Sequence, residues 1–511
     1  MVVRAYQFRE DNGPLAHPVR PASFVEINNF YTATVYEKGA EVIGMLKLLV
    51  GDEAYANALD LYFERHDGDA ATIEDWLQVF QDTTGRDLSQ FAKWYSQAGT
   101  PRLTVSDEFV DGTYHLHLRQ ETAATPGQDT KGPLLLPVAV GLLNENGAEV
   151  LPTKVLELTN TAQSFTFEGL GSKPIPSILR NFSAPVIVIH DKTMAERAFL
   201  LAHDTDPFNR WDAGRTLSQD VLVRMVVEDA TPDAAFLDGL AAVLREDALN
   251  PAFRALVLRL PDEEDTAQAL FDAGHTPDPT IINQAHETLK LHIAQHLQDT
   301  MTRVYADMIV TGPYTSDAAP AGKRALGNAV LGLLSKLDGG KQASQQFDDA
   351  DNMTQQLGAL RALLQISKGA DALSAFETQW QHDRLVMDKW FALQVSLAAP
   401  DAAAATARRL TNHSTFDIKN PNRFRSIFGG LKANTAGFHH ASGAAYDLLA
   451  DWLIKLDPLN PQTAARITMS YDTWRRYDAD RQGKMREALA RIAQTSGLSR
   501  DTSEMVTRIL G

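Results

Sequence analysis

Hydrophobic residues recur at helical spacing over residues 34–97. The i, i+1, i+4, i+7, i+8 pattern of one buried helix face is followed by Val42, Ile43, Leu46, Leu49 and Val50. This pattern predicts a helix that begins near Thr34, and similar patterns predict helices over 52–65, 73–83 and 88–97. Asp87 and Gln90 form a capping signature at the start of the last of these helices.

Proline pairs dominate the stretch before Thr34. Gly13-Pro14, His17-Pro18 and Arg20-Pro21 disfavour helix, because the residue before a proline is pushed toward extended backbone. We therefore expect an extended, loop-rich lead-in over residues 1–33.

The period changes to two over residues 102–189. Apolar and polar residues alternate from Tyr114 to Leu118, and the run from Val186 to Ile189 is typical of a fully buried strand. Turn residues such as Gly112 and Gly171 separate about seven short strands, which predicts an Ig-like β-sandwich.

From residue 194 to residue 511 the pattern is helical, in pieces of roughly 10 to 20 residues separated by Pro, Asn or Gly. The spacing suits paired helices stacked into an α-solenoid, although no repeat is visible in the sequence itself. Within this stretch the pair Gly429-Gly430 indicates a helix break. The predicted fold is thus multidomain and mainly α, with domains at 1–99, 100–192 and 193–511.

Composition narrows the functional classes. The chain has 511 residues, too many for one hydrophobic core, and a formal charge of −17. That charge argues against nucleic acid or an anionic membrane as a partner, because phosphates attract Lys/Arg patches. The chain has no cysteine, which excludes disulfides and thiolate chemistry and fits a reducing compartment. It also has no signal peptide or long apolar stretch, so we expect a cytoplasmic location.

One stretch of the sequence contains a motif that points to a catalytic mechanism. Residues 28–42 read NNFYTATVYEKGAEV, and five further landmarks lie along the chain at 7–11 (QFRED), 17–21 (HPVRP), 62–66 (YFERH), 94–101 (WYSQAGTP) and 420–423 (NPNR). In this order they resemble stretches of the bacterial aminopeptidase N (alanyl aminopeptidase) family of gluzincin zinc metallopeptidases. The resemblance spans nearly all of the chain and implies that residues 1–99 are the helical C-terminal part of a thermolysin-like catalytic domain.

The resemblance lacks the metal site. Family members bind zinc through H-E-x-x-H and a further Glu, and hold the substrate amine with a Gly-x-Met-Glu-Asn loop, all upstream of the point that matches Met1. We therefore expect zinc and peptide substrates in the full-length enzyme, but neither zinc nor peptidase activity in this chain alone. The alternative function is a non-catalytic α-solenoid binding protein derived from a peptidase.

The resemblance assigns Tyr36 to oxyanion stabilisation. A tyrosine suits that task because its phenol, with an ordinary pKa of about 10, donates a hydrogen bond at neutral pH. The structural alternative is that Tyr36 only packs at a helix start.

Three further sites are weaker. The resemblance implies a C-terminal helical bowl, so Arg423 or Arg466 is a candidate for the substrate chamber, whereas Asn420-Pro421 is a helix start with an Asn cap. Among residues 286–296, His286, His292 and His296 are spaced for helical faces but lack a zincin pattern. A structural role is favoured there over an adventitious metal site.

The missing front of a catalytic domain has a physical consequence. Apolar surface would be left on residues 1–99, so we predict self-association through this region or mobility in residues 1–33.

Overall fold

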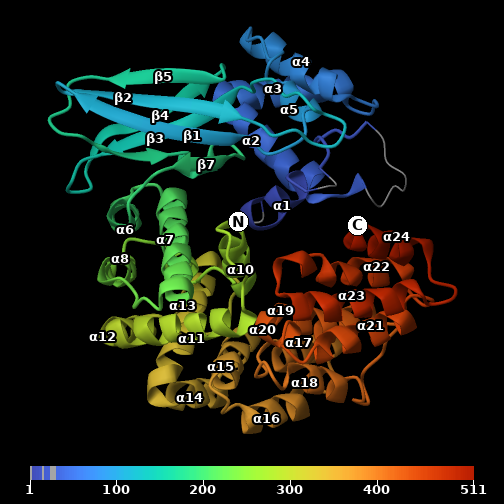
Figure 1. The fold of residues 1–511 in the computed structure, drawn as a ribbon. Coiled ribbons are helices and arrows are strands. Elements are labelled where there is room, and N and C mark those ends of the chain that lie inside the picture. The colour runs from blue at the N-terminus through green and yellow to red at the C-terminus, as the bar shows by residue number, and fades with distance from the viewer. Residues whose placement is uncertain (1–2, 14–15, 23–29) are drawn as a thin grey trace. The chain divides into compact units, whose positions relative to one another are not determined.

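A computed structural model describes residues 3–13, 16–22 and 30–511. The chain divides into two compact units, residues 1–213 and 214–511, and each is described by itself (Figure 1). The mainly α, multidomain architecture predicted from periodicity is confirmed.

The first unit begins with a helical region. Its elements are the π-helical turns η1 (Val3–Gln7) and η3 (Thr34–Lys38) and the α-helices α1 (Phe8–Asp11), α2 (Gly39–Val50), α3 (Asp52–His66), α4 (Ile73–Thr84) and α5 (Lys93–Ser96). The helix start near Thr34 and the helices over 52–65 and 73–83 are confirmed. The predicted extended lead-in is wrong for residues 3–11, because the first proline restricts only its own neighbourhood and leaves the preceding residues free to turn. The predicted mobility of residues 1–33 falls partly outside the described residues.

Two details of these helices differ from the sequence pattern. The buried residues of α2 include Val42, Met45 and Leu46, whereas Ile43 is 39% exposed, because the i, i+3, i+4 face excludes it. The helix predicted over 88–97 is limited to α5. The Gln90 side-chain amide donates to the Thr159 carbonyl oxygen at 2.7 Å instead of closing a capping box.

The first unit continues as a two-sheet sandwich. Its strands are β1 (Arg102–Val110), β2 (Thr113–Glu121), β3 (Leu136–Leu143), β4 (Glu149–Leu158), β5 (Ala162–Phe167), β6 (Ile175–Ile178) and β7 (Ile187–His190). One sheet has the order β5-β2-β1-β7 and the other β4-β3-β6; β1 pairs in parallel with β7, and the other pairs are antiparallel. The predicted sandwich is confirmed.

Alternation in β2 positions the core of the sandwich. Tyr114, Leu116 and Leu118 are buried, while the histidines between them lie on the other face. All eight residues of β3 are buried, as expected for a strand covered on both sides. The run from Val186 to Ile189 is not fully buried, since Ile189 is 43% exposed on an edge strand.

One hydrophobic cluster joins the helical region to the sandwich. It includes Val42, Leu46 and Trp94 from the helices together with Leu103 and Val140 from the two sheets. The division between domains at 99/100 therefore lies within a continuous core and stays a prediction.

Two helices follow the sandwich, α6 (Met194–His203) and α7 (Pro207–Glu228). The remaining α-helices are α8 (Ala234–Arg245), α9 (Pro251–Val257), α10 (Glu263–Asp272), α11 (Pro279–His296), α12 (Gln298–Asp307), α13 (Ala318–Asp338), α14 (Lys341–Asp349), α15 (Met353–Gln365), α16 (Ala370–Trp380), α17 (Arg384–Ser396), α18 (Ala403–Leu410), α19 (Pro421–Ala433), α20 (Thr435–Phe438), α21 (Ala444–Leu456), α22 (Pro461–Thr468), α23 (Ala479–Ala493) and α24 (Arg500–Leu510). Two 3-10 turns, η5 (Met469–Tyr471) and η6 (Trp474–Arg476), connect α22 to α23.

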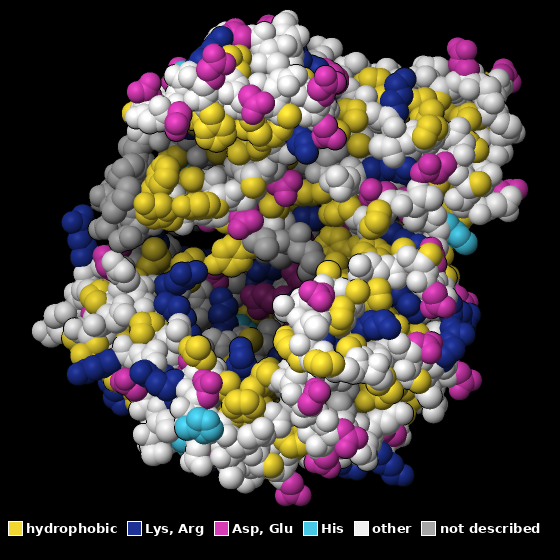
Figure 2. Space-filling model, turned by 180° about the vertical axis from the view of Figure 1, so that it is seen from behind, with side chains coloured by type: hydrophobic (Ala, Val, Ile, Leu, Met, Phe, Trp, Pro, Cys, Tyr) yellow, Lys and Arg dark blue, Asp and Glu magenta, His cyan; other side chains and the backbone are white. Residues whose placement is uncertain are grey.

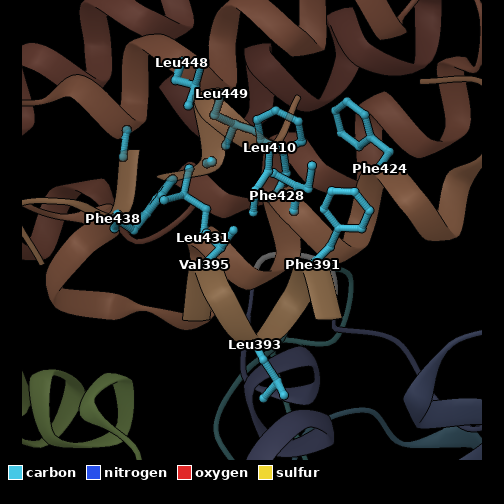
Figure 3. Close-up of a cluster of buried hydrophobic side chains, with 14 of the residues drawn as sticks. Phe391, Leu393, Val395, Leu410, Phe424, Phe428, Leu431, Phe438, Leu448 and Leu449 are labelled. Atoms are coloured by element: carbon cyan, nitrogen blue, oxygen red, sulfur yellow. The ribbon is translucent and has the colours of Figure 1, made fainter. Parts of the chain in front are cut away.

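Helices of this second unit pack on near neighbours in the chain, for example α13 on α15, α17 on α19, and α21 on α23. The apolar faces of α13 to α24 contribute to one large cluster, part of which includes Phe391, Phe424 and Phe428 (Figure 3), whereas residues of α10 and α11 form a separate cluster. This pairing agrees with the predicted stacked helices.

The predicted break at Gly429-Gly430 is wrong, because both glycines lie inside α19. A Cβ at Gly430 would come 3.1 Å from the Ala392 carbonyl oxygen of α17, whereas a Cβ at Gly429 would meet nothing within 4 Å. Gly430 therefore serves a close approach of two helices. The predicted Asn420 cap is confirmed: its side chain accepts from the amides of Asn422 and Arg423, with Pro421 in the first turn.

Among the helices that the structure describes, none is long and apolar enough to cross a membrane.

Candidate functional site

Tyr36 occupies the middle of the π-helical turn η3, directly before α2. Thr34 and Lys38 are buried and stand four residues apart on one face, and Tyr36 lies two residues from each. Two residues of helix turn a side chain toward the opposite side, so the Tyr36 side chain is 59% exposed. Its ring stacks on Tyr31, with centroids 6.2 Å apart and an interplanar angle of 29°.

Thr34 ties the start of this turn to α1. The Glu10 Oε1 atom accepts from the Thr34 backbone amide at 2.7 Å and from the Thr34 hydroxyl at 2.6 Å. The Gln7 side-chain amide donates to the same hydroxyl at 3.2 Å. The amide and the hydroxyl of Thr34 therefore make three hydrogen bonds to the segment 7–10.

Lys38 ties the end of the turn to two other segments. Its Nζ donates to Asp11 Oδ2 at 2.7 Å and to the Gly99 carbonyl oxygen at 3.0 Å, and lies 5.8 Å from the centroid of the Trp94 ring. The Lys38 and Asp11 side chains are 1% and 0% exposed. Burial lowers the pKa of Lys38, and the Asp11 carboxylate opposes this shift.

Asp11 completes the arrangement. Its Oδ1 accepts from the Gly99 amide at 3.0 Å, and its Oδ2 also accepts from the Thr100 hydroxyl at 2.8 Å. Three of the sequence landmarks, at 7–11, 28–42 and 94–101, therefore meet around one buried carboxylate. Sequence reasoning missed Glu10, Asp11, Thr34 and Lys38, because it does not pair residues this far apart. The available signal was the charged Lys38 in register with the buried positions of α2.

No group of three or more His, Cys, Asp or Glu residues among the described residues is arranged to hold a metal ion. Two histidines of α11 have other partners: His286 Nε2 lies 3.0 Å from the Thr266 hydroxyl, and His296 Nε2 lies 3.0 Å from Asp238 Oδ1. Burial lowers the pKa of His286 to about 4, which fits a neutral, hydrogen-bonded core residue. The structural role that the sequence favours for this helix agrees with these contacts.

Arg423 is buried within the helical unit. Its Nε donates to Asp388 Oδ1 at 2.5 Å, its Nη1 donates to the Thr415 carbonyl oxygen at 2.5 Å, and its guanidinium lies over the Phe391 ring at 4.7 Å. With a side chain only 3% exposed, Arg423 holds helices together, and its geometry does not favour the predicted chamber position. Arg466 differs, because its side chain is exposed on α22.

Comparisons with known proteins agree on one relationship. Residues 2–95 match the Peptidase family M1 domain, residues 99–191 match a domain of unknown function with an Ig-like fold (DUF3458), and residues 194–511 match a domain of unknown function with ARM repeats (DUF3458_C). The last description supports the predicted array of stacked helices.

Two curated relatives match almost the whole chain. Aminopeptidase N of Caulobacter vibrioides is 41% identical over 519 residues, which cover 100% of this chain and 60% of the relative. Aminopeptidase N of Escherichia coli is 38% identical, covering 99% of this chain and 60% of the relative. The chain thus spans about 60% of the length of these relatives.

A solved structure shows a similar fold. The crystal structure of Legionella pneumophila aminopeptidase A in complex with aspartic acid matches with a TM-score of 0.84 and 28% identity, covering 100% of this chain and 62% of that one.

Proposed function

Because the chain belongs to the aminopeptidase N family, we propose that it is the part of a peptide-cleaving aminopeptidase that supplies the oxyanion-stabilising residue, Tyr36. The observation that supports this proposal most is the exposed phenol on a turn anchored at its start by a partly buried contact and at its end by a buried one. Substrates of the complete enzyme are peptides, from which it removes N-terminal residues.

The chemistry of the proposed step is simple. When a peptide bond is attacked, the carbonyl oxygen becomes an oxyanion, and a hydrogen-bond donor aimed at that oxygen lowers the barrier. A phenol donates its proton to such a bond without ionising, since its ordinary pKa is about 10. Tyr36 acts in this way on the developing oxyanion, and losing one such donor costs about 100-fold to 1000-fold in kcat.

Aminopeptidases of the M1 family generally depend on zinc. The described residues of this chain do not fit such a site, because none of their His, Asp and Glu side chains cluster in threes. We propose that zinc is bound by residues that this sequence does not contain, and that the 511-residue chain alone is inactive.

A chimera tests the role of Tyr36. The 511-residue chain replaces its matching region in the Caulobacter relative, and kcat for alanyl p-nitroanilide is measured with and without Tyr36→Phe. We expect kcat to fall by about 100-fold or more with little change in KM. Tyr314→Phe is the control, because Tyr314 is another exposed tyrosine, 53% accessible, in the helical unit. A kcat within twofold of the parent chimera for Tyr36→Phe would refute the proposal.

Arg466 remains the chamber candidate. As an exposed cation on α22, it is suited to attract the carboxylate or a carbonyl oxygen of a peptide. We expect Arg466→Ala to raise KM for peptides in the chimera and to leave kcat nearly unchanged. An unchanged KM for peptide substrates would remove Arg466 from the site.

Three further proposals concern the domain bounds, the location and the self-association of the chain. The domains are 1–99, 100–192 and 193–511, close to the residues matched by three family models. The location is cytoplasmic, consistent with a cysteine-free sequence.

The third proposal is that the chain self-associates through residues 1–99. Ile43, Leu48 and Phe63 are exposed there by 39%, 40% and 60%, and Figure 2 shows apolar side chains in patches on the surface. Sedimentation velocity over a concentration series tests this, and Phe63→Ser should weaken the association. A monomer at all concentrations would contradict it.

A further inference from the structure

We propose that Lys38 and Asp11 are positioning residues that fix the orientation of Tyr36. This inference rests on the proposed function of Tyr36. It starts from the ion pair between Lys38 Nζ and Asp11 Oδ2, 2.7 Å apart, with both side chains almost fully buried.

A buried ion pair is a poor way to stabilise a fold. Removing both charges from water costs as much as their attraction returns, so apolar replacements of the same volume are often neutral or stabilising. The pair has instead a directional consequence, since a charge-assisted bond fixes where both partners lie. The desolvation cost of the Lys38–Asp11 pair is therefore better explained by a role in orienting its surroundings than by a gain in stability.

The orientation concerns the turn that carries Tyr36. Lys38 is the last residue of η3 and the residue before α2, so its bond to Asp11 fixes the end of the turn. Asp11 is itself held by the Gly99 amide and the Thr100 hydroxyl, which come from the far end of the helical region. The turn therefore cannot rotate about its axis without breaking the bonds of Lys38 to Asp11 and to the Gly99 carbonyl oxygen.

The π-helical winding of η3 supports the same conclusion. Single π turns are rare and occur often at functional sites, where they alter the direction of a side chain. Between the buried Thr34 and Lys38, this turn presents Tyr36 outward. Tyr36 has no comparable anchor of its own in the described contacts, apart from stacking on Tyr31.

A double-mutant cycle in the chimera tests the inference. Lys38→Met should lower kcat by about 10-fold to 100-fold with KM nearly unchanged, because a catalytic group displaced by about 1 Å loses that much. In the Tyr36→Phe background the same substitution should lower kcat by less than about twofold, because the residue on which it acts is already absent. An equal loss in both backgrounds would show a general structural role and overturn the inference.

A second variant separates loss of positioning from misfolding. Asp11→Asn combined with Lys38→Met removes both charges and keeps an acceptor for the Gly99 amide, so no lone charge is buried. We expect it to fold and to show the same loss of kcat, again only when Tyr36 is present. A kcat equal to that of the parent chimera would refute the positioning role.

Hydrogen exchange of the 511-residue chain gives a readout that needs no activity. The amides of residues 35–39 should exchange at least about 10-fold faster in the variant that combines Asp11→Asn with Lys38→Met than in the parent chain, because the turn has lost its ion pair. Arg65→Met is the matched control, since it breaks the partly exposed pair with Asp82 in the same region. Unchanged exchange over residues 35–39 would overturn the inference even if Tyr36→Phe confirmed the proposed function. If Tyr36 itself has no catalytic role, the Tyr36→Phe chimera will instead keep the kcat of the parent chimera.

Discussion

Glu10 and Thr34 are joined by two hydrogen bonds to a single carboxylate oxygen. Oε1 of Glu10 accepts from the amide and from the hydroxyl of Thr34, at 2.7 and 2.6 Å. This relationship closes the start of the turn that carries Tyr36, just as Lys38 closes its end. Tyr36 thus lies between two polar contacts, one partly buried and one buried.

The Thr34 hydroxyl should matter for local stability. Thr34→Val leaves the volume nearly unchanged but removes a donor to Glu10 and an acceptor for Gln7, so we expect a loss of about 1 to 3 kcal/mol in the free energy that protects α2 from exchange. Thr34→Ser keeps the hydroxyl and should lose less than about 1 kcal/mol, the value of one buried methyl group. Equal losses for the two variants would show that the hydroxyl is not the important group.

Two adjacent glycines give opposite predictions. Gly429→Ala lies at an exposed position of α19 with open space around its Cβ, so it should stabilise the helical unit by about 0.5 to 1 kcal/mol. Gly430→Ala places a Cβ 3.1 Å from the Ala392 carbonyl oxygen and should destabilise the unit by about 1 to 3 kcal/mol. Urea unfolding of the two variants side by side measures both effects, and changes of the same sign would contradict the close helix approach.

A third glycine lies beneath a buried arginine of the sandwich. A Cβ at Gly141 of β3 would lie 2.1 Å from Arg180 Cζ, and Arg180 donates to Glu149 and Thr153 at 2.6 and 2.9 Å. Gly141→Ala should displace the guanidinium from its partners and cost about 3 to 5 kcal/mol, the usual loss when a buried ion pair is broken. Gly171→Ala is the control, because nothing lies within 4 Å of its Cβ. A melting temperature for Gly141→Ala equal to that of the control would contradict this packing.

These examples also show what the sequence could and could not predict. Periodicity located α3, α4 and the alternation of β2, because a helix or strand with one buried face repeats apolar residues at a regular spacing. It misjudged Gly429-Gly430, because glycine marks both a helix end and a close helix contact, and only the neighbouring helix distinguishes the two. The neighbouring sequence predicts a catalytic role for Tyr36, which stays a prediction. Its supports, Glu10 and Asp11, lie 24 and 27 residues from their partners, and no local pattern encodes such pairings.

His286 should make stability depend on pH. Burial lowers its pKa in the folded chain to about 4, with the Lys290 charge adding to the shift, whereas an unfolded histidine has a pKa of about 6.5. Above about pH 6.5 His286 is neutral in both the folded and the unfolded chain, so its titration does not lower stability there. As the pH falls from there toward 4, the unfolded chain takes up a proton that the folded chain does not, and stability falls by about 1.4 kcal/mol per pH unit.

The variant His286→Gln isolates this contribution. Glutamine does not titrate and can still hydrogen-bond to the Thr266 hydroxyl. We expect the unfolding free energy of the parent chain, relative to that of His286→Gln, to fall steadily as the pH is lowered from 7 to 4.5. Urea unfolding of both proteins measures this. A difference that does not change over this range would show that His286 is not a buried neutral group.

The central claim is that this chain carries the oxyanion donor of an aminopeptidase but not its metal site. The most direct test is the hydrolysis of alanyl p-nitroanilide by the purified 511-residue chain with one equivalent of zinc, with bound zinc measured on the same sample. The account predicts no tightly bound zinc and no turnover above the rate in buffer. Bound zinc at one equivalent per chain, with turnover that Tyr36→Phe abolishes, would contradict it.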